Sequence, residues 1–121
     1  MLLIGFAGAA GAISRYAVQT WVNGINGGPT VTGTFIVNIS GAFLLGLLMA
    51  LSEDRFTGAL WPVVIAVGFL GAYTTFSTLM FDVVSRAEQG SLDAALLNLA
   101  ASILFGLLAA YGGLLLGRAA T

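Results

Sequence analysis

Long apolar stretches alternate with short polar ones along this chain. Three stretches carry no charged residue, namely residues 19–52, 56–81 and 94–117. A helix needs about 20 apolar residues to cross roughly 30 Å of hydrocarbon, so each stretch is long enough to span a membrane. The pattern therefore predicts a membrane protein built from helices.

Turn-forming residues divide the apolar stretches into separate spans. Asn, Gly and Pro crowd residues 23–29, and polar or charged residues mark 52–55 and 86–90 as two further loops. We predict four transmembrane helices, at approximately residues 2–22, 31–51, 58–84 and 92–118. No linker or repeat divides the chain, so we expect a single four-helix transmembrane domain over residues 1–121, of the all-α class.

The composition excludes most enzyme chemistry. Hydrophobic residues make up 59% of the 121 residues and charged residues 7%, against roughly 25% charged in soluble domains. Cysteine, histidine and lysine are absent, which removes disulfides, thiol nucleophiles and Cys/His metal sites. Because nucleophile, base and metal ligands are missing as a constellation, we do not expect an enzyme, and without a basic patch we expect no nucleic-acid partner.

The loops carry too few cations to set one orientation. Cytoplasmic loops normally hold the excess of Lys and Arg. With four spans, Arg55 and Arg118 lie on one side of the membrane and Arg86 lies on the other. A chain with so little bias can insert both ways and pair antiparallel with itself, and four short helices enclose little space for a polar path. We therefore expect an antiparallel, dual-topology homodimer in the lipid bilayer.

The second span carries a polar stripe. Thr34, Asn38 and Gly41 follow i, i+4, i+7 spacing and share one face of an otherwise apolar helix. An Asn at mid-membrane often only joins two helices by hydrogen bonds. Its amide N–H groups can also donate to an anion, which an aliphatic side chain cannot do. Asn38 is therefore a candidate for either role.

The third span holds the densest polar cluster. Residues 68–79 combine two glycines with four Ser or Thr hydroxyls, a poor composition for an undisturbed helix, so we predict a break at mid-membrane. Freed carbonyls persist at bilayer depth only where they are buried, line a cavity or coordinate an ion. In an antiparallel dimer the broken helices would cross at the twofold axis, where paired carbonyls suit a hard monovalent cation. Alternatively, each hydroxyl bonds its own i−4 carbonyl and the helix only bends.

Three further features fit an anion path less specifically. The positive edge of the Phe76 ring can favour a small anion without trapping it, although most phenylalanines in membrane proteins face lipid or the core. Arg15 lies about 20 Å along the first span and is equally an interfacial anchor or an anion-attracting vestibule residue. Asn98, Ser102 and Phe105 share a face of the fourth span and form a weaker polar stripe.

The polar residues of the first three spans form recognisable motifs. These are Gly11-Ala12-x-x-Arg15-Tyr16, Gly33-Thr34-x-x-Val37-Asn38-x-x-Gly41 and Gly68-Phe69-x-Gly71-x-x-Thr74-Thr75-Phe76-Ser77-Thr78. In this order they resemble the CrcB/Fluc family of fluoride channels. The match covers three of the four predicted spans, and its third motif is the specific one.

The resemblance implies an antiparallel, dual-topology homodimer with two narrow pores that exports fluoride passively from the bacterial cytoplasm across the inner membrane. It also implies a structural sodium ion at the dimer centre, held by the backbone carbonyls of Gly71 and Thr74. Carried over position by position, it assigns Arg15 to a vestibule. It assigns six residues to the fluoride pore: Asn38, Phe76, Ser77, Thr78, Leu79 and Ser102. Selectivity for fluoride over chloride rests on the resemblance alone, because spacing in a sequence gives no distances.

Two positions depart from the family pattern. Leu79 stands where the family usually has a second pore phenylalanine, so the aromatic pair is incomplete. Asn98 stands where the fourth helix often carries a pore-facing tyrosine. Both departures concern the anion path more than the fold.

Two other functions fit a small four-helix membrane protein. A small dual-topology multidrug or cation exporter needs a titratable acid inside the membrane, and none of the five acids falls at mid-span. A membrane adaptor that only holds partners would need no buried hydroxyl cluster. The exporter is therefore the first alternative and the adaptor the second.

Overall fold

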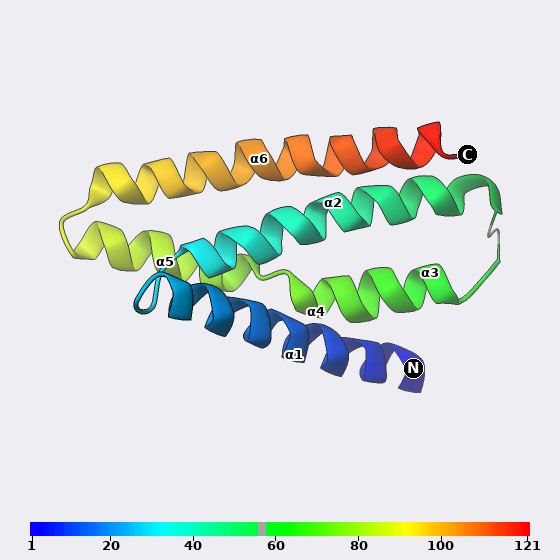
Figure 1. Ribbon diagram of the computed structural model, residues 1–121, viewed down its shortest axis with the longest axis horizontal. Helices are drawn as coiled ribbons and strands as arrows, with labels where there is room; N and C mark the ends of the chain where they lie inside the picture. Colours follow the sequence, from blue (N-terminus) through cyan, green and yellow to red (C-terminus); the bar gives the residue numbers. More distant parts are fainter. Residues whose placement is uncertain (56–57) are drawn as a thin grey trace.

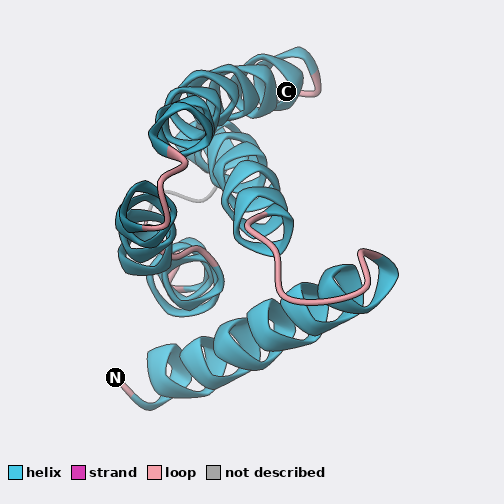
Figure 2. Cartoon of the chain, turned by 90° about the vertical axis from the view of Figure 1, so that its left-hand side faces the viewer, coloured by secondary structure: helices cyan, strands magenta, loops and turns pink. Residues whose placement is uncertain are grey.

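The regular structure of the described residues is entirely helical, which confirms the all-α class. The computed structural model describes residues 1–55 and 58–121, with the backbone alone at 53–55. The helices are α1 (Leu2–Ile25), α2 (Thr32–Arg55), α3 (Trp61–Val63), the π-helix η1 (Val64–Leu70), α4 (Gly71–Tyr73), α5 (Phe76–Glu88) and α6 (Leu92–Ala119). α6 packs mainly on α2, and α1 packs on η1 and α4 (Figure 1). Seen from the end, α1 lies obliquely along one side of the bundle (Figure 2).

Three of the described helical segments are long and apolar enough to cross a membrane: Thr32–Ser52, Trp61–Glu88 and Leu92–Ala119. They confirm the second, third and fourth predicted spans. The predicted first helix is present as α1 and has 24 residues, as α2 does. Arg15 and Gln19 interrupt the apolar sequence of α1. That α1 also crosses the membrane stays a prediction.

One predicted loop is wrong, and the other two are confirmed but begin three residues later than predicted, because α1 continues to Ile25 and α5 to Glu88. α2 continues through residues 52–55, where no glycine or proline ends the helix and the Ser52 hydroxyl donates to the Leu48 carbonyl at 2.6 Å. The loops at 26–31 and 89–91 contain Gly27 and Gly90, whose positive φ angles of 78° and 84° favour glycine.

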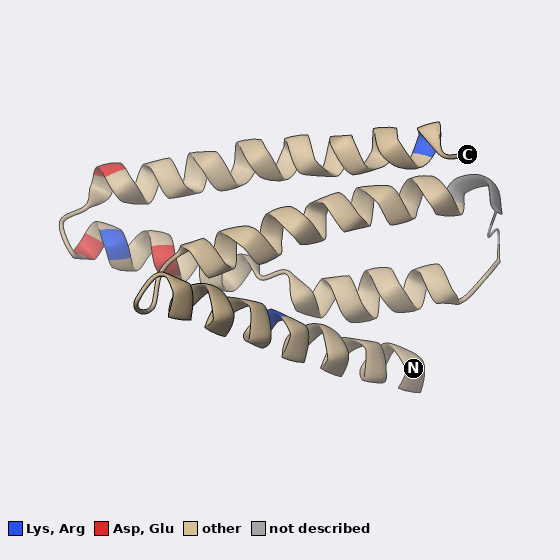
Figure 3. Ribbon diagram, in the orientation of Figure 1, with Lys and Arg blue, Asp and Glu red and all other residues tan. Residues whose placement is uncertain are grey.

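The connections alternate between the two ends of the bundle as the span order predicts. The α1–α2 and α5–α6 connections lie at one end, and both termini lie at the other (Figure 1). Charged residues gather toward the ends, whereas the one cation of α1, Arg15, lies partway along its helix (Figure 3). The long middle of the bundle is therefore mostly uncharged along the described helices.

Glycines bring the helices into direct backbone contact. A Cβ atom at Gly46 of α2 would overlap the Ala110 carbonyl of α6, and one at Gly113 of α6 would overlap the Phe43 carbonyl of α2. Small residues allow such close approach in membrane helices, where apolar burial adds little driving force between helices. Tight helix packing is thus present between α2 and α6.

The third span is broken where the hydroxyl cluster lies. α3, η1 and α4 form one continuous helical segment that ends at Tyr73. Thr74 (φ −81°, ψ 157°) and Thr75 (φ −149°, ψ 105°) are extended, and α5 begins at Phe76. Thr74 Oγ1 does donate to the Leu70 carbonyl at 3.0 Å, as in the alternative of a bent helix, but the helix breaks nonetheless. The predicted mid-span break is confirmed.

Candidate functional site

The break is bridged by the side chain of Asn38 from α2. Asn38 Nδ2 donates to the Thr75 carbonyl at 3.1 Å, and Asn38 Oδ1 accepts from the Thr75 N–H at 2.7 Å. One amide thus satisfies both backbone polar groups of an extended residue, groups that would be costly to leave unpaired at this depth. These bonds use one of the two amide hydrogens, so the other stays available to a further acceptor.

Backbone carbonyls lose their helical partners at the break, and those of Gly71 and Thr74 are among them. In an unbroken α-helix the Thr75 N–H would donate to the Gly71 carbonyl. By the same rule the Thr78 N–H would donate to the Thr74 carbonyl. Instead the Thr75 N–H donates to Asn38, and the Thr78 N–H donates to Thr75 Oγ1 at 3.3 Å. The Gly71 and Thr74 carbonyls, both candidate sodium ligands, are therefore released.

Hydroxyl groups cap the second half of the broken helix. Thr75 is the N-cap of α5, and its Oγ1 also donates to Thr78 Oγ1 at 2.9 Å. Ser77 Oγ lies 3.5 Å from Thr75 Oγ1. The 13-residue helix α5 directs its positive N-terminal end at this cluster. The break thus gathers neutral hydrogen-bond donors in a positive local field and no formal charge.

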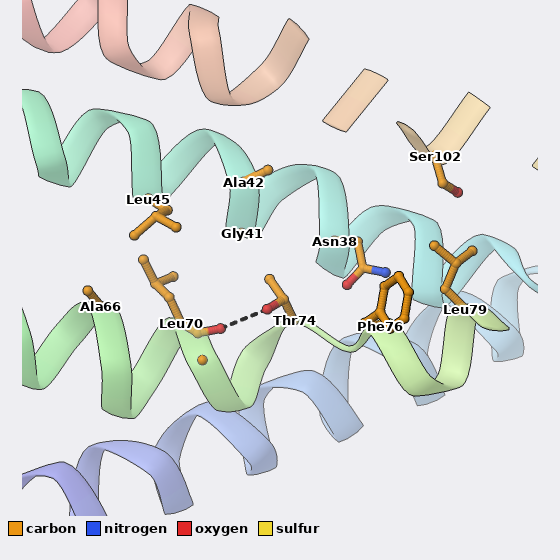
Figure 4. A pocket seen from close by; sticks show the side chains of 11 residues that line it. Asn38, Gly41, Ala42, Leu45, Ala66, Leu70, Thr74, Phe76, Leu79 and Ser102 are labelled. Atoms are coloured by element: carbon orange, nitrogen blue, oxygen red, sulfur yellow. Dashed lines mark hydrogen bonds between the residues drawn. The ribbon is translucent and has the colours of Figure 1, made fainter. Parts of the chain in front are cut away.

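A cavity of about 350 Å³ lies against the break. It is lined by α2, both halves of the third span and α6, through Asn38, Gly41, Ala42, Leu45, Ala66, Leu70, Gly71, Thr74, Phe76, Leu79 and Ser102 (Figure 4). Four of the six predicted pore residues line it, namely Asn38, Phe76, Leu79 and Ser102. Both predicted sodium ligands line it as well. Residues predicted from three separate spans are therefore brought together.

Gly41 allows α2 to approach the break closely. A Cβ atom at this position would overlap Thr74 Cγ2 and lie 3.3 Å from Tyr73 Cδ1. Next to it, Ser40 Oγ and the Tyr73 hydroxyl are 3.0 Å apart and share a hydrogen bond. The Tyr73 ring stacks on Phe69 with ring centroids 5.8 Å apart. These contacts hold the end of α4 against α2 and so position the released carbonyls.

The remaining predicted site residues do not line this cavity. Ser77 is exposed, Arg15 is half-buried on α1, and Thr78 is half-buried and lines a different cavity. Phe76 and Leu79, two apolar residues that line the cavity, differ in how much of each is exposed. The Phe76 side chain is 74% exposed in the single chain, whereas Leu79 is 8% exposed and packs inside it.

A second, more polar cavity escaped the sequence analysis. It has a volume of about 240 Å³ and is lined by Tyr16, Gln19, Thr20, Asn23, Thr30, Thr34, Thr78 and Asp82. Gln19 Nε2 donates to Thr34 Oγ1 at 3.3 Å across it. The one available signal is Thr34, which lies one turn before Asn38 on the polar stripe of the second span. The other lining residues include ones from α1 and α5, and the sequences of those helices carry no polar stripe that would place them beside Thr34.

Comparison with known proteins agrees with this arrangement. The family described as CrcB-like protein, Camphor Resistance (CrcB), matches residues 2–114. The protein named fluoride-specific ion channel FluC 1 of Symbiobacterium thermophilum is 50% identical over 120 residues, covering 96% of this chain and 95% of that protein. Fluoride-specific ion channels FluC of Hydrogenovibrio crunogenus and Acidobacterium capsulatum are 39% and 37% identical, covering 98% and 97% of this chain and 90% and 94% of theirs. With its family-typical motifs assembled around one broken helix, the chain belongs to the CrcB family.

Proposed function

We propose that this chain forms a channel that lets fluoride leave the bacterial cytoplasm passively across the inner membrane. The observation that supports it most is the break bridged by Asn38, where neutral donors meet a cavity at mid-span. Neutral donors can replace the water around a small anion, and the absence of a fixed cation among the cavity residues avoids trapping it. The names of the relatives point to fluoride as that anion.

The channel is proposed to be an antiparallel homodimer with dual topology. Polar backbone at membrane depth must be buried in protein or line a water-filled cavity. In one chain the released carbonyls line a cavity beside Phe76, whose side chain is 74% exposed, so a second copy is needed to cover the break. A twofold axis duplicates every path, which makes two pores per dimer.

A sodium ion is proposed to sit at the dimer centre. The donor set fits a hard cation, since the Gly71 and Thr74 carbonyls lose their helical partners at the break, and two copies would supply such oxygens from both sides. Among the described residues no group of His, Cys, Asp or Glu could hold a metal instead. When bound, the ion would join the two breaks and fix their spacing.

Fluoride efflux from liposomes containing the purified protein tests this proposal, with chloride efflux as the control. We expect fast fluoride efflux and negligible chloride efflux. In Phe76→Ile the exposed ring and its positive edge are lost, and we expect fluoride efflux to fall by about tenfold or more. Replacing sodium by N-methyl-D-glucamine on both sides is expected to lower the flux. Equal flux without sodium would contradict the sodium site, and no fluoride flux at all would contradict the channel.

The alternative exporter makes a different prediction in the same liposomes. It needs an acid at mid-span, whereas the acid of the third span, Asp82, lies about 9 Å from the end of that helix at Glu88. Proton-coupled uptake of a cationic dye without fluoride efflux would favour the exporter. Fluoride efflux without a proton gradient would exclude coupled exchange as its mechanism.

A further inference from the structure

A third cavity lies at the end of the bundle that holds the α1–α2 and α5–α6 connections (Figure 1). Residues 29–31 form one wall of this cavity, which has a volume of about 370 Å³. The other wall is polar and consists of Asp82, Ser85, Arg86, Gln89 and Ser91. The third span ends at Glu88, so Arg86 lies about 3 Å from that end. The cavity is therefore at the level where the hydrocarbon meets the lipid headgroups.

The α5 residues that line this cavity share one face of the helix. Residues 82, 85, 86 and 89 follow i, i+3, i+4, i+7 spacing. On the neighbouring face of α5 the side chains of Phe81 and Val84 are exposed. α5 thus brings polar groups to the cavity and apolar side chains next to it, at the membrane surface. A phospholipid has the same order of parts, a polar headgroup joined to apolar chains.

The cavity contains one cation and one acid. Among the described residues the Arg86 guanidinium forms no hydrogen bond or ion pair, and Asp82 acts on it through its charge alone. The five N–H donors of Arg86 are therefore available, and their planar arrangement suits a phosphate group. Asp82 lies one turn before Arg86, about 6 Å along the helix axis, and can accept hydrogen bonds from a cationic group.

Two serine hydroxyls add donors that the protein leaves unused. Gln89 Nε2 donates to Ser85 Oγ at 3.0 Å, a bond that leaves the hydroxyl hydrogen of Ser85 available. Ser91 is the N-cap residue of α6, but its hydroxyl makes no capping hydrogen bond. Both hydroxyls lie on the same polar wall as Arg86. The wall therefore offers several donors and a single carboxylate to a ligand.

We propose that this cavity binds the headgroup of a membrane phospholipid that carries a primary amine, such as phosphatidylethanolamine. The phosphate accepts hydrogen bonds from Arg86 and Ser91, and the ammonium group donates to Asp82. The acyl chains then lie along the exposed Phe81 and Val84. A choline headgroup has the same charges but no N–H donor for Asp82, so the cavity should prefer the amine.

Lipid titration of the purified protein in detergent tests the site, with the melting temperature as the readout. A ligand that binds only the folded state raises the melting temperature in proportion to its occupancy. We expect phosphatidylethanolamine to act at about tenfold lower concentration than phosphatidylcholine with the same acyl chains, the effect of one hydrogen bond to a charged group. Because this readout requires no fluoride flux, its result is independent of the proposed channel.

Variants of the two charged residues should change the titration in different ways. Arg86→Gln should weaken binding of both lipids by about tenfold or more, whereas Arg86→Lys, which keeps the charge, should weaken it less. Asp82→Asn should remove the preference for phosphatidylethanolamine over phosphatidylcholine. Arg118→Gln is the matched control, since it removes the same charge at the other end of the bundle and should respond as the wild type does.

Four results would overturn the proposal. Equal responses of the wild type to the two lipids would exclude recognition of the amine, and a stronger response to phosphatidylglycerol would show an anionic headgroup instead. Soluble phosphoethanolamine acting at the same concentration as the lipid would identify a free phosphate ester as the ligand. Equal titrations of the wild type and Arg86→Gln would place the lipid elsewhere on the protein.

Discussion

At the scale of single residues, Asn38 shows what a sequence pattern reveals and what it leaves open. Its position on a polar stripe identifies it as a helix contact or an anion donor, and the structure gives it the first role directly. Its partner, the Thr75 peptide, lies 37 positions away, and only the crossing of α2 and the broken helix brings the two together. The single remaining N–H of the amide leaves room for the second role.

The Asn38→Asp variant tests how much the bridge contributes. Aspartate keeps an acceptor for the Thr75 N–H but loses the donor to the Thr75 carbonyl, and its charge would repel an anion. We expect the free energy of unfolding to fall by about 1–3 kcal/mol and fluoride efflux to fall at least about tenfold. Thermal unfolding and liposome efflux measure the two effects.

Asn23→Asp is the stability control for this variant. Asn23 uses only its side-chain oxygen, which accepts from the Thr30 N–H at 3.2 Å, and aspartate retains that acceptor. The free energy of unfolding of Asn23→Asp should fall by less than that of Asn38→Asp, because no hydrogen bond is lost and only the new charge near Asp82 opposes folding. Equal destabilisation by both substitutions would contradict the special role of the bridge at the break.

At the scale of elements, composition predicts that the third span breaks but not how. Two glycines and four hydroxyls in residues 68–79 mark the region, because side-chain oxygens compete with helical hydrogen bonds. The exact site, between Tyr73 and Phe76, depends on the Thr75 cap and on Asn38 from another helix. The π-helix η1 before it has the apolar sequence VIAVGFL, which carries no signal that separates it from an ordinary α-helix.

Neighbouring glycines on α6 test the packing of α6 on α2. In Gly113→Ala the new Cβ overlaps the Phe43 carbonyl, so the helices must separate. In Gly112→Ala the Cβ meets no atom of the chain within 4 Å. We expect Gly113→Ala to lower the free energy of unfolding by about 1–3 kcal/mol, as overpacking does, and Gly112→Ala to leave it within about 1 kcal/mol. Equal melting temperatures for the two variants would contradict the close α2–α6 contact.

At the scale of the whole molecule, the sequence predicts how the chain runs back and forth between the two ends of the bundle. The association of two chains is inferred from physical reasoning about the break. Three apolar spans and the alternation of loops between the ends follow from hydropathy and turn residues. Arg15 and Gln19 lower the signal of the first helix, which is why length and composition confirm three spans and not four. The proposed dimer rests on a different argument, since a break with released carbonyls cannot face lipid.

The proposed dual topology has a direct consequence that labelling in intact cells can measure. The chain contains no cysteine, so Asn26→Cys and Thr121→Cys each add one thiol, at opposite ends of the bundle (Figure 1). Among the described side chains Arg86 is a cation at one end and Arg118 at the other, which gives little bias in either direction. We therefore expect a membrane-impermeant maleimide to label about half of the molecules at each site. Full labelling at one site and none at the other would show a single orientation, and the antiparallel dimer would then be excluded.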